Sequence, residues 1–166
     1  MNVKQMELDA NGEKPKFNDE GQEMLYFEKE DEIEFWNLIQ NVKKAKGDVN
    51  VLIDEIRQKP FQSAVKMDTW FNNFAVRLSR IIEKEKEISD RISEQDYAGF
   101  IDHLIFLGKE KVAEIILGNG EILKSDDGLF WDKTGKPWQF YIWDKTTKRR
   151  YYWVGVVPKE IESMKK

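Results

Sequence analysis

The sequence predicts an α+β protein, in which an N-terminal bundle of four to five helices is followed by a C-terminal three- to four-stranded antiparallel β-meander. Apolar residues recur at helical spacing up to about residue 118. After that point, short aromatic and β-branched runs are separated by turn residues, which is the pattern of strands. Because helices and strands occupy separate parts of the chain instead of alternating, an α/β sheet is not expected.

The chain is expected to divide into three regions. Residues 1–22 are polar and interrupted by glycine and proline, so we expect a mobile acidic tail. Residues 23–118 form the helical region, and residues 119–166 form the β-meander with a short basic C-terminal tail. The length of 166 residues and the hydrophobic share of 40% suit one packed unit, in which the meander lies against the helices.

The first two helices are predicted by apolar spacing and by their end signals. Ile33, Trp36 and Ile39 recur every three residues and define the first helix, which Gly47 is expected to end. Asp48 is expected to cap the second helix, because its short side chain can accept a hydrogen bond from a backbone N–H group of the first turn.

Three further helices complete the predicted bundle. Pro60 is expected to end the second helix, and either Asp68 or Thr69 is expected to cap the third. The tetrapeptide at residues 93–96 (SEQD) resembles a capping box and predicts the start of a fourth helix. Lys109–Leu117 predicts a short fifth helix, bounded by glycine on both sides.

The predicted strands follow a change in the period of the apolar pattern. They are Glu121–Lys124, Leu129–Trp131, Pro137–Trp143 and Arg149–Val157. Pro158 is expected to end the last strand, because proline cannot donate a hydrogen bond to a neighbouring strand. The remaining residues predict a short basic helix or tail.

A six-residue segment occurs twice in the meander. Residues 131–136 (WDKTGK) recur twelve positions later as residues 143–148 (WDKTTK). Asp and Thr side chains in such segments accept hydrogen bonds from the backbone a few positions further on. Each copy therefore predicts a hairpin turn.

The second turn predicts how its flanking strands pair. An even-length loop centred on residues 146–147 places Ile142 opposite Tyr151 and Trp143 opposite Arg150. Side chains alternate between the two sides of a strand, so one side is expected to be core. The predicted core side holds Trp138, Phe140, Ile142, Tyr151 and Trp153, with Phe140 opposite Trp153.

The other side of this hairpin and its turn form the predicted binding site, which we name the hairpin face. It consists of Tyr141, Trp143, Lys145, Lys148, Arg149, Arg150 and Tyr152. Tyr, Trp and Arg are the residue types enriched at protein–protein contacts. The charge also gathers here: residues 133–166 carry nine basic against three acidic side chains, whereas residues 1–40 carry four against eleven.

The sequence predicts a non-catalytic interaction protein whose hairpin face binds a protein partner. Its Lys-, Glu- and Ile-rich composition suits a bacterial, phage or mobile-element accessory factor, such as an inhibitor or regulator. Single-stranded nucleic acid is the alternative partner, since bases stack on aromatic rings and phosphates pair with cations. The net charge of −4 disfavours a duplex partner.

Catalysis and cofactors are not expected. With no cysteine and one histidine, His103, the chain lacks thiolate and two-histidine metal sites. His103 is interpreted as a packing residue, and the chain has no glycine-rich phosphate loop. A metal-dependent hydrolase built on Asp126, Asp127 and Asp132 is the second alternative. With no signal peptide and no apolar run long enough to span a bilayer, we expect a cytoplasmic protein without membrane contact.

Overall fold

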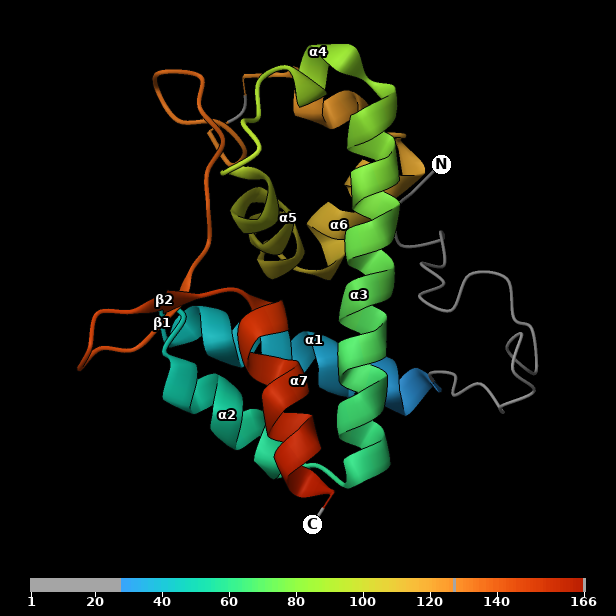
Figure 1. Cartoon of the computed structure of the whole chain (residues 1–166). Helices are drawn as coiled ribbons and strands as arrows, with labels where there is room; N and C mark the ends of the chain where they lie inside the picture. The colour runs from blue at the N-terminus through green and yellow to red at the C-terminus, as the bar shows by residue number, and fades with distance from the viewer. Residues whose placement is uncertain (1–27, 127, 166) are drawn as a thin grey trace.

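The computed structural model describes residues 28–126 and 128–165, which are mostly helical (Figure 1). The elements are α1 (Lys29–Lys44), α2 (Val49–Arg57), α3 (Phe61–Lys84), α4 (Lys86–Ser89), α5 (Tyr97–Phe106), α6 (Lys109–Leu117), the 3₁₀ helix η2 (Glu121–Lys124), β1 (Ile142–Trp143), β2 (Arg150–Tyr151) and α7 (Trp153–Met164). The predicted acidic tail, residues 1–22, lies outside the described residues.

The predicted α+β class is wrong, because the described sheet consists of one antiparallel pair of two-residue strands and not of a three- to four-stranded meander. Glu121–Lys124 forms the 3₁₀ helix η2. Leu129–Trp131 contributes one isolated bridge, between Trp131 and Pro137. The last predicted strand is replaced from Trp153 onward by α7, and Pro158 lies inside that helix.

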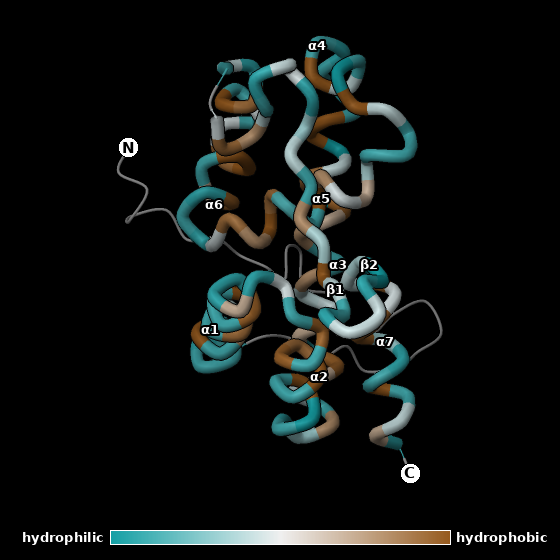
Figure 2. The backbone as a smooth tube through the Cα atoms, turned by 90° about the vertical axis from the view of Figure 1, so that its left-hand side faces the viewer, coloured by the Kyte–Doolittle hydropathy of each residue, from teal (hydrophilic) through white to brown (hydrophobic). Residues whose placement is uncertain are grey.

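Helix α3 is the axis of the molecule. It has 24 residues, a length of about 36 Å at 1.5 Å per residue, and runs past the other helices from one end to the other (Figure 1). Helices α4, α5 and α6 pack toward its C-terminal end, and α1, α2 and α7 toward its N-terminal end. Figure 2 shows the hairpin of β1 and β2 at the level between these two groups.

The start of α3 corrects the predicted cap. The helix begins at Phe61 after Pro60, so Asp68 lies inside the helix and caps nothing. Its carboxylate instead accepts a hydrogen bond of 2.8 Å from Nε1 of Trp153. Two other predicted helix starts are confirmed: Asp48 accepts a 3.0 Å hydrogen bond from the backbone N–H of Asn50, and α6 spans Lys109–Leu117 as expected.

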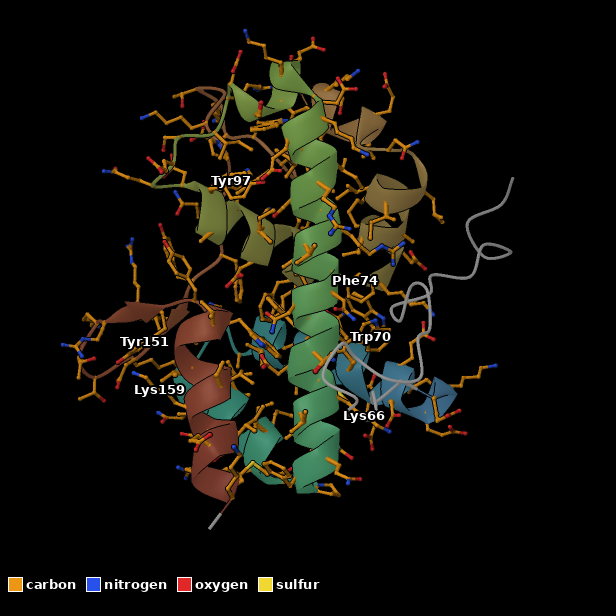
Figure 3. The ribbon with its side chains drawn as sticks, turned by 45° about the vertical axis from the view of Figure 1, so that its right-hand side comes forward. Lys66, Trp70, Phe74, Tyr97, Tyr151 and Lys159 are labelled. Carbon is orange, nitrogen blue, oxygen red and sulfur yellow. The ribbon has the colours of Figure 1, made fainter. Side chains whose placement is uncertain are left out.

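The core is aromatic where the two groups of helices meet. The indole of Trp153 is fully buried and stacks on Phe71 of α3, with ring centroids 4.1 Å apart and the planes inclined by 3°. Trp70 and Phe74 lie one turn apart on the same helix, as Figure 3 shows, and both contact Phe35 of α1. This cluster joins α1, α3 and α7 around one apolar centre.

Helix α7 forms where the sequence predicts a strand because a distant residue caps it. Tyr152, which precedes the helix, makes no capping contact with its side chain. The cap is instead Asp102 of α5, whose carboxylate accepts a 3.0 Å hydrogen bond from the backbone N–H of Trp153. The described helices include none with the length and apolar character needed to cross a bilayer.

Candidate functional site

The hairpin of β1 and β2 has the predicted register. Ile142 pairs with Tyr151 and Trp143 with Arg150 in an antiparallel ladder. The predicted pairing of Phe140 with Trp153 is wrong, because β2 ends at Tyr151 and Trp153 begins α7. The hairpin is therefore a short projection between two anchored ends and not the edge of a larger sheet.

The turn of the hairpin is held by its own aspartate. The carboxylate of Asp144 accepts hydrogen bonds from the backbone N–H groups of Thr146 at 2.8 Å and Thr147 at 3.3 Å. Asp132 makes the equivalent bond to Thr134 at 2.8 Å in the other copy of the repeated segment. Both copies are turns, as the repeat predicts.

The first arm of the hairpin lies against the turn between α1 and α2. The backbone N–H of Trp143 donates to the carbonyl of Gly47 at 2.9 Å, and its indole Nε1 donates to the carbonyl of Lys46 at 2.8 Å. Gly47 has a φ of 82°, and a Cβ atom there would lie 2.3 Å from the carbonyl oxygen of Tyr141. Glycine is therefore required for this close approach.

The segment that leads into the hairpin is held by α5. Phe140 stacks on Phe106 with ring centroids 4.2 Å apart. The side-chain amide of Gln139 donates to the carboxylate of Asp96 at 2.5 Å and accepts a hydrogen bond from the hydroxyl of Tyr141. The segment before β1 is therefore held by contacts with α5 and with the residue before it.

An open depression of about 490 Å³ lies beside the hairpin. Its lining consists of Lys46, Gln139, Phe140, Tyr141, Trp143 and Arg150. Among these described residues two are cations and none is acidic. Its walls come from the α1–α2 turn, the segment before β1 and both strands, so the tertiary structure assembles it.

Two cations of the hairpin face lie over two of its rings. The guanidinium carbon of Arg150 is 4.6 Å from the ring centroid of Tyr141, and Nζ of Lys148 is 5.2 Å from that of Trp143. The ring of Tyr152 lies tilted against that of Tyr141, with centroids 6.1 Å apart and planes inclined by 31°. These contacts orient the charged groups and leave them exposed to solvent.

The structure brings most of the predicted site residues together. Tyr141, Trp143 and Arg150 line the depression, and Lys148 and Tyr152 contact that group. Lys145 lies at the turn, with its ammonium 3.5 Å from the carboxylate of Asp48. Arg149 is exposed beside it. Figure 3 places the neighbouring Tyr151 on the hairpin, at one side of the molecule.

Sequence reasoning missed Lys46. It belongs to the α1–α2 turn, and no pattern in the chain links that turn to residues 139–150. Lys46 has a positive φ of 57°, which aims its carbonyl at the indole of Trp143. Gln139 is also absent from the predicted site, and Phe140 is predicted as a core residue, yet both line the depression.

Three buried or half-buried titratable groups, Asp102, Asp68 and His103, have partners within the fold. Burial raises the pKa of Asp102 to about 7, and the hydrogen bond from Trp153 opposes that rise. Burial also raises the pKa of Asp68. Burial lowers the pKa of His103, whose Nε2 lies 2.6 Å from the carbonyl oxygen of Leu129 and must donate to it. The interpretation of His103 as a packing residue agrees with these contacts.

The aspartates of the hydrolase alternative are engaged separately. Asp126 lies 3.6 Å from the guanidinium of Arg91. Hydrogen bonds from Thr134 and Lys136 lower the pKa of Asp132 within its own turn. Asp127 lies outside the described residues. In the described part of the chain, acidic and histidine side chains form no cluster of three or more that could hold a metal ion.

Comparisons of the chain with protein-family models, with characterised proteins and with solved structures find no match. In residues 28–126 and 128–165, fold and site together define a helical protein with a basic and aromatic hairpin.

Proposed function

We propose that this protein is a non-catalytic binding protein that recognises another protein through the hairpin face. The observation that carries the proposal is the depression at which Tyr141, Trp143 and Arg150 meet Lys46 of the α1–α2 turn. Tyr, Trp and Arg are the side chains that most often dominate protein–protein binding energy. An inhibitor or regulator of its partner is the role that such a small binding protein would have.

The contacts that hold the hairpin in place support this proposal. Its turn is closed by Asp144, its first strand is bonded to Gly47, and the segment before it is bonded to Asp96 through Gln139. A surface that is ordered in advance loses little conformational entropy when a partner binds. The exposed cations on this surface are not needed for any of these internal contacts.

A single-stranded nucleic acid is less favoured as the partner. Base stacking needs an open ring face. Here Arg150 lies over Tyr141, and Lys148 lies over Trp143. The chain also carries a net charge of −4, which opposes the approach of a long polyanion.

The lack of cysteine supports our proposal of a reducing, cytoplasmic location.

Site-specific photocrosslinking in the native cells tests the proposed function. A photoreactive amino acid at the exposed position of Arg149 is expected to give a discrete protein adduct, whereas the same amino acid at Lys133, in the other repeated turn, is not. The double variant Tyr141→Ala/Arg150→Ala, confirmed as folded by circular dichroism, is expected to lose the adduct. Identical adducts from both positions, or a nuclease-sensitive adduct, would show that the hairpin face is not a protein-binding site.

A further inference from the structure

The hairpin face lies in a region of concentrated positive charge on an acidic chain. Segments 43–48 and 144–150 together contain seven Lys or Arg side chains and two aspartates. The bridge between Asp48 and Trp143 lies where the two segments meet, and Lys46 of the first and Arg150 of the second line the same depression. The whole chain has a net charge of −4, so this concentration is local.

Neither aspartate of this region forms a described ion pair with a cation that lines the depression. Asp48 accepts a hydrogen bond from the backbone of Asn50 and pairs with Lys145. Asp144 accepts hydrogen bonds from the backbone of the turn. Both carboxylates are engaged by the fold itself. Lys46 and Arg150, which line the depression, have no carboxylate among the described ion pairs.

The lining between these two cations is aromatic. Phe140, Tyr141 and Trp143 form it, and Arg150 remains exposed above Tyr141. Such a surface is complementary to a segment in which carboxylates flank an apolar or aromatic side chain. The carboxylates would pair with the cations, and the apolar side chain would enter the depression between them.

We infer that the hairpin face binds an acidic segment of a partner protein, with Asp or Glu side chains on both sides of an apolar residue. This inference rests on the proposed protein-binding function and adds the chemistry of the partner. Arg150 and Lys46 bind the carboxylates, and the depression between them accepts the apolar side chain. A short acidic segment meets only the local positive charge, whereas a long nucleic acid also meets the acidic remainder of the chain.

Fluorescence anisotropy with a labelled peptide that repeats Glu-Asp-Phe-Glu-Asp tests the inference. We expect the full chain to bind this peptide, more weakly as the salt concentration rises. The matched peptide with Gln and Asn in place of Glu and Asp is expected not to bind. Labelled oligo(dT) is expected to bind at least about tenfold more weakly. No binding of the acidic peptide, or tighter binding of oligo(dT), would overturn the inference.

A pair of charge reversals locates the binding. Arg150→Glu is expected to weaken binding of the acidic peptide by about tenfold or more. Lys133→Glu changes the net charge equally at an exposed position of the other repeated turn and is expected to leave the affinity within about twofold. Equal loss in the two variants would show that only net charge matters and would overturn the assignment of the site. Circular dichroism confirms that both variants are folded.

Two further outcomes separate this inference from the proposed function. If the crosslinked adduct forms at the hairpin face but the acidic peptide does not bind, the inferred acidic character of the partner segment is wrong. The proposed protein-binding function would still hold. Light scattering could show that the purified protein self-associates as its concentration rises, and that Arg150→Glu abolishes this self-association. In that case the hairpin face binds a second copy of the chain. That result would overturn the inference of a separate acidic partner.

Discussion

The carboxylate of Asp102 accepts a hydrogen bond of 3.0 Å from the backbone N–H of Trp153, and this one contact joins α5 to the first residue of α7. Asp102 is 7% exposed, and the indole of Trp153 is fully buried. The same indole donates to Asp68 of α3 at 2.8 Å. One buried and one half-buried carboxylate, from two helices, therefore hold the point at which the chain leaves the hairpin and enters α7.

The stability of the protein is expected to depend on pH through Asp102. Burial raises the pKa of Asp102 to about 7 in the folded state, whereas the unfolded chain has the ordinary value near 3.8. Between these values the folded state binds more protons, so the free energy of unfolding falls as the pH rises from about 4 to about 7. The full difference from this one group is at most about 4 kcal/mol.

The variant Asp102→Asn isolates this effect. Its amide oxygen can still accept the hydrogen bond from Trp153, but it has no proton to lose. Urea unfolding at pH 4.5 and pH 7.5 is expected to show a smaller decrease for the variant than for the parent protein. His103 acts in the opposite direction, because its lowered pKa reduces stability on acidification below about 6.5. His103 and Asp68 are present in both proteins, so equal decreases would contradict the role of Asp102.

Loss of the Trp153 side chain is expected to destabilise the protein strongly. Trp153→Ala removes a fully buried indole, its stacking on Phe71 and its hydrogen bond to Asp68, at a cost of about 3–5 kcal/mol in the free energy of unfolding. Trp138 is 45% exposed, so Trp138→Ala is expected to cost about 1 kcal/mol. Chemical denaturation measures both values. Comparable losses would mean that Trp153 is not the core residue described above.

Replacing Gly47 by alanine is expected to lower the stability of the protein, whereas replacing Gly155 by alanine is expected to raise it. Gly47→Ala places an L-residue at a φ of 82° and a Cβ atom 2.3 Å from the carbonyl of Tyr141, so we expect a loss of about 2 kcal/mol. Gly155 lies inside α7, where a Cβ atom meets nothing within 4 Å, so Gly155→Ala is expected to add about 0.5–1 kcal/mol. Thermal melting distinguishes the two variants. A higher melting temperature for Gly47→Ala than for the parent protein would contradict the close approach of Gly47 to the carbonyl of Tyr141.

The hairpin is the part of the candidate site that could be predicted from sequence. Its register depends on a turn in which Asp144 bonds to residues two and three positions away, so the information is local. The same holds for the cap of α2 by Asp48. Lys46 could not be predicted to line the same depression as Arg150, because this depends on how the α1–α2 turn packs against the hairpin.

The prediction of a meander was wrong for a related reason. Residues 149–157 are rich in aromatic and β-branched side chains, which favour strands. Strand propensity is weak where no neighbouring strand is available, and here the chain pairs for only two residues. Asp102 supplies the helix cap that the local sequence lacks, and burial of Trp153 and Val157 stabilises α7.

Local sequence is enough to predict the short-range features: the cap at Asp48, the two aspartate turns, the extent of α6 and the pairing of Trp143 with Arg150. Each of these features depends on groups that lie a few positions apart or within one turn. Only the packing of the helices determines that Trp153 starts a helix and that Lys46 lines the depression beside the hairpin. Those outcomes depend on Asp102 and Gly47, far away in sequence, whose contacts form only when the helices pack around α3.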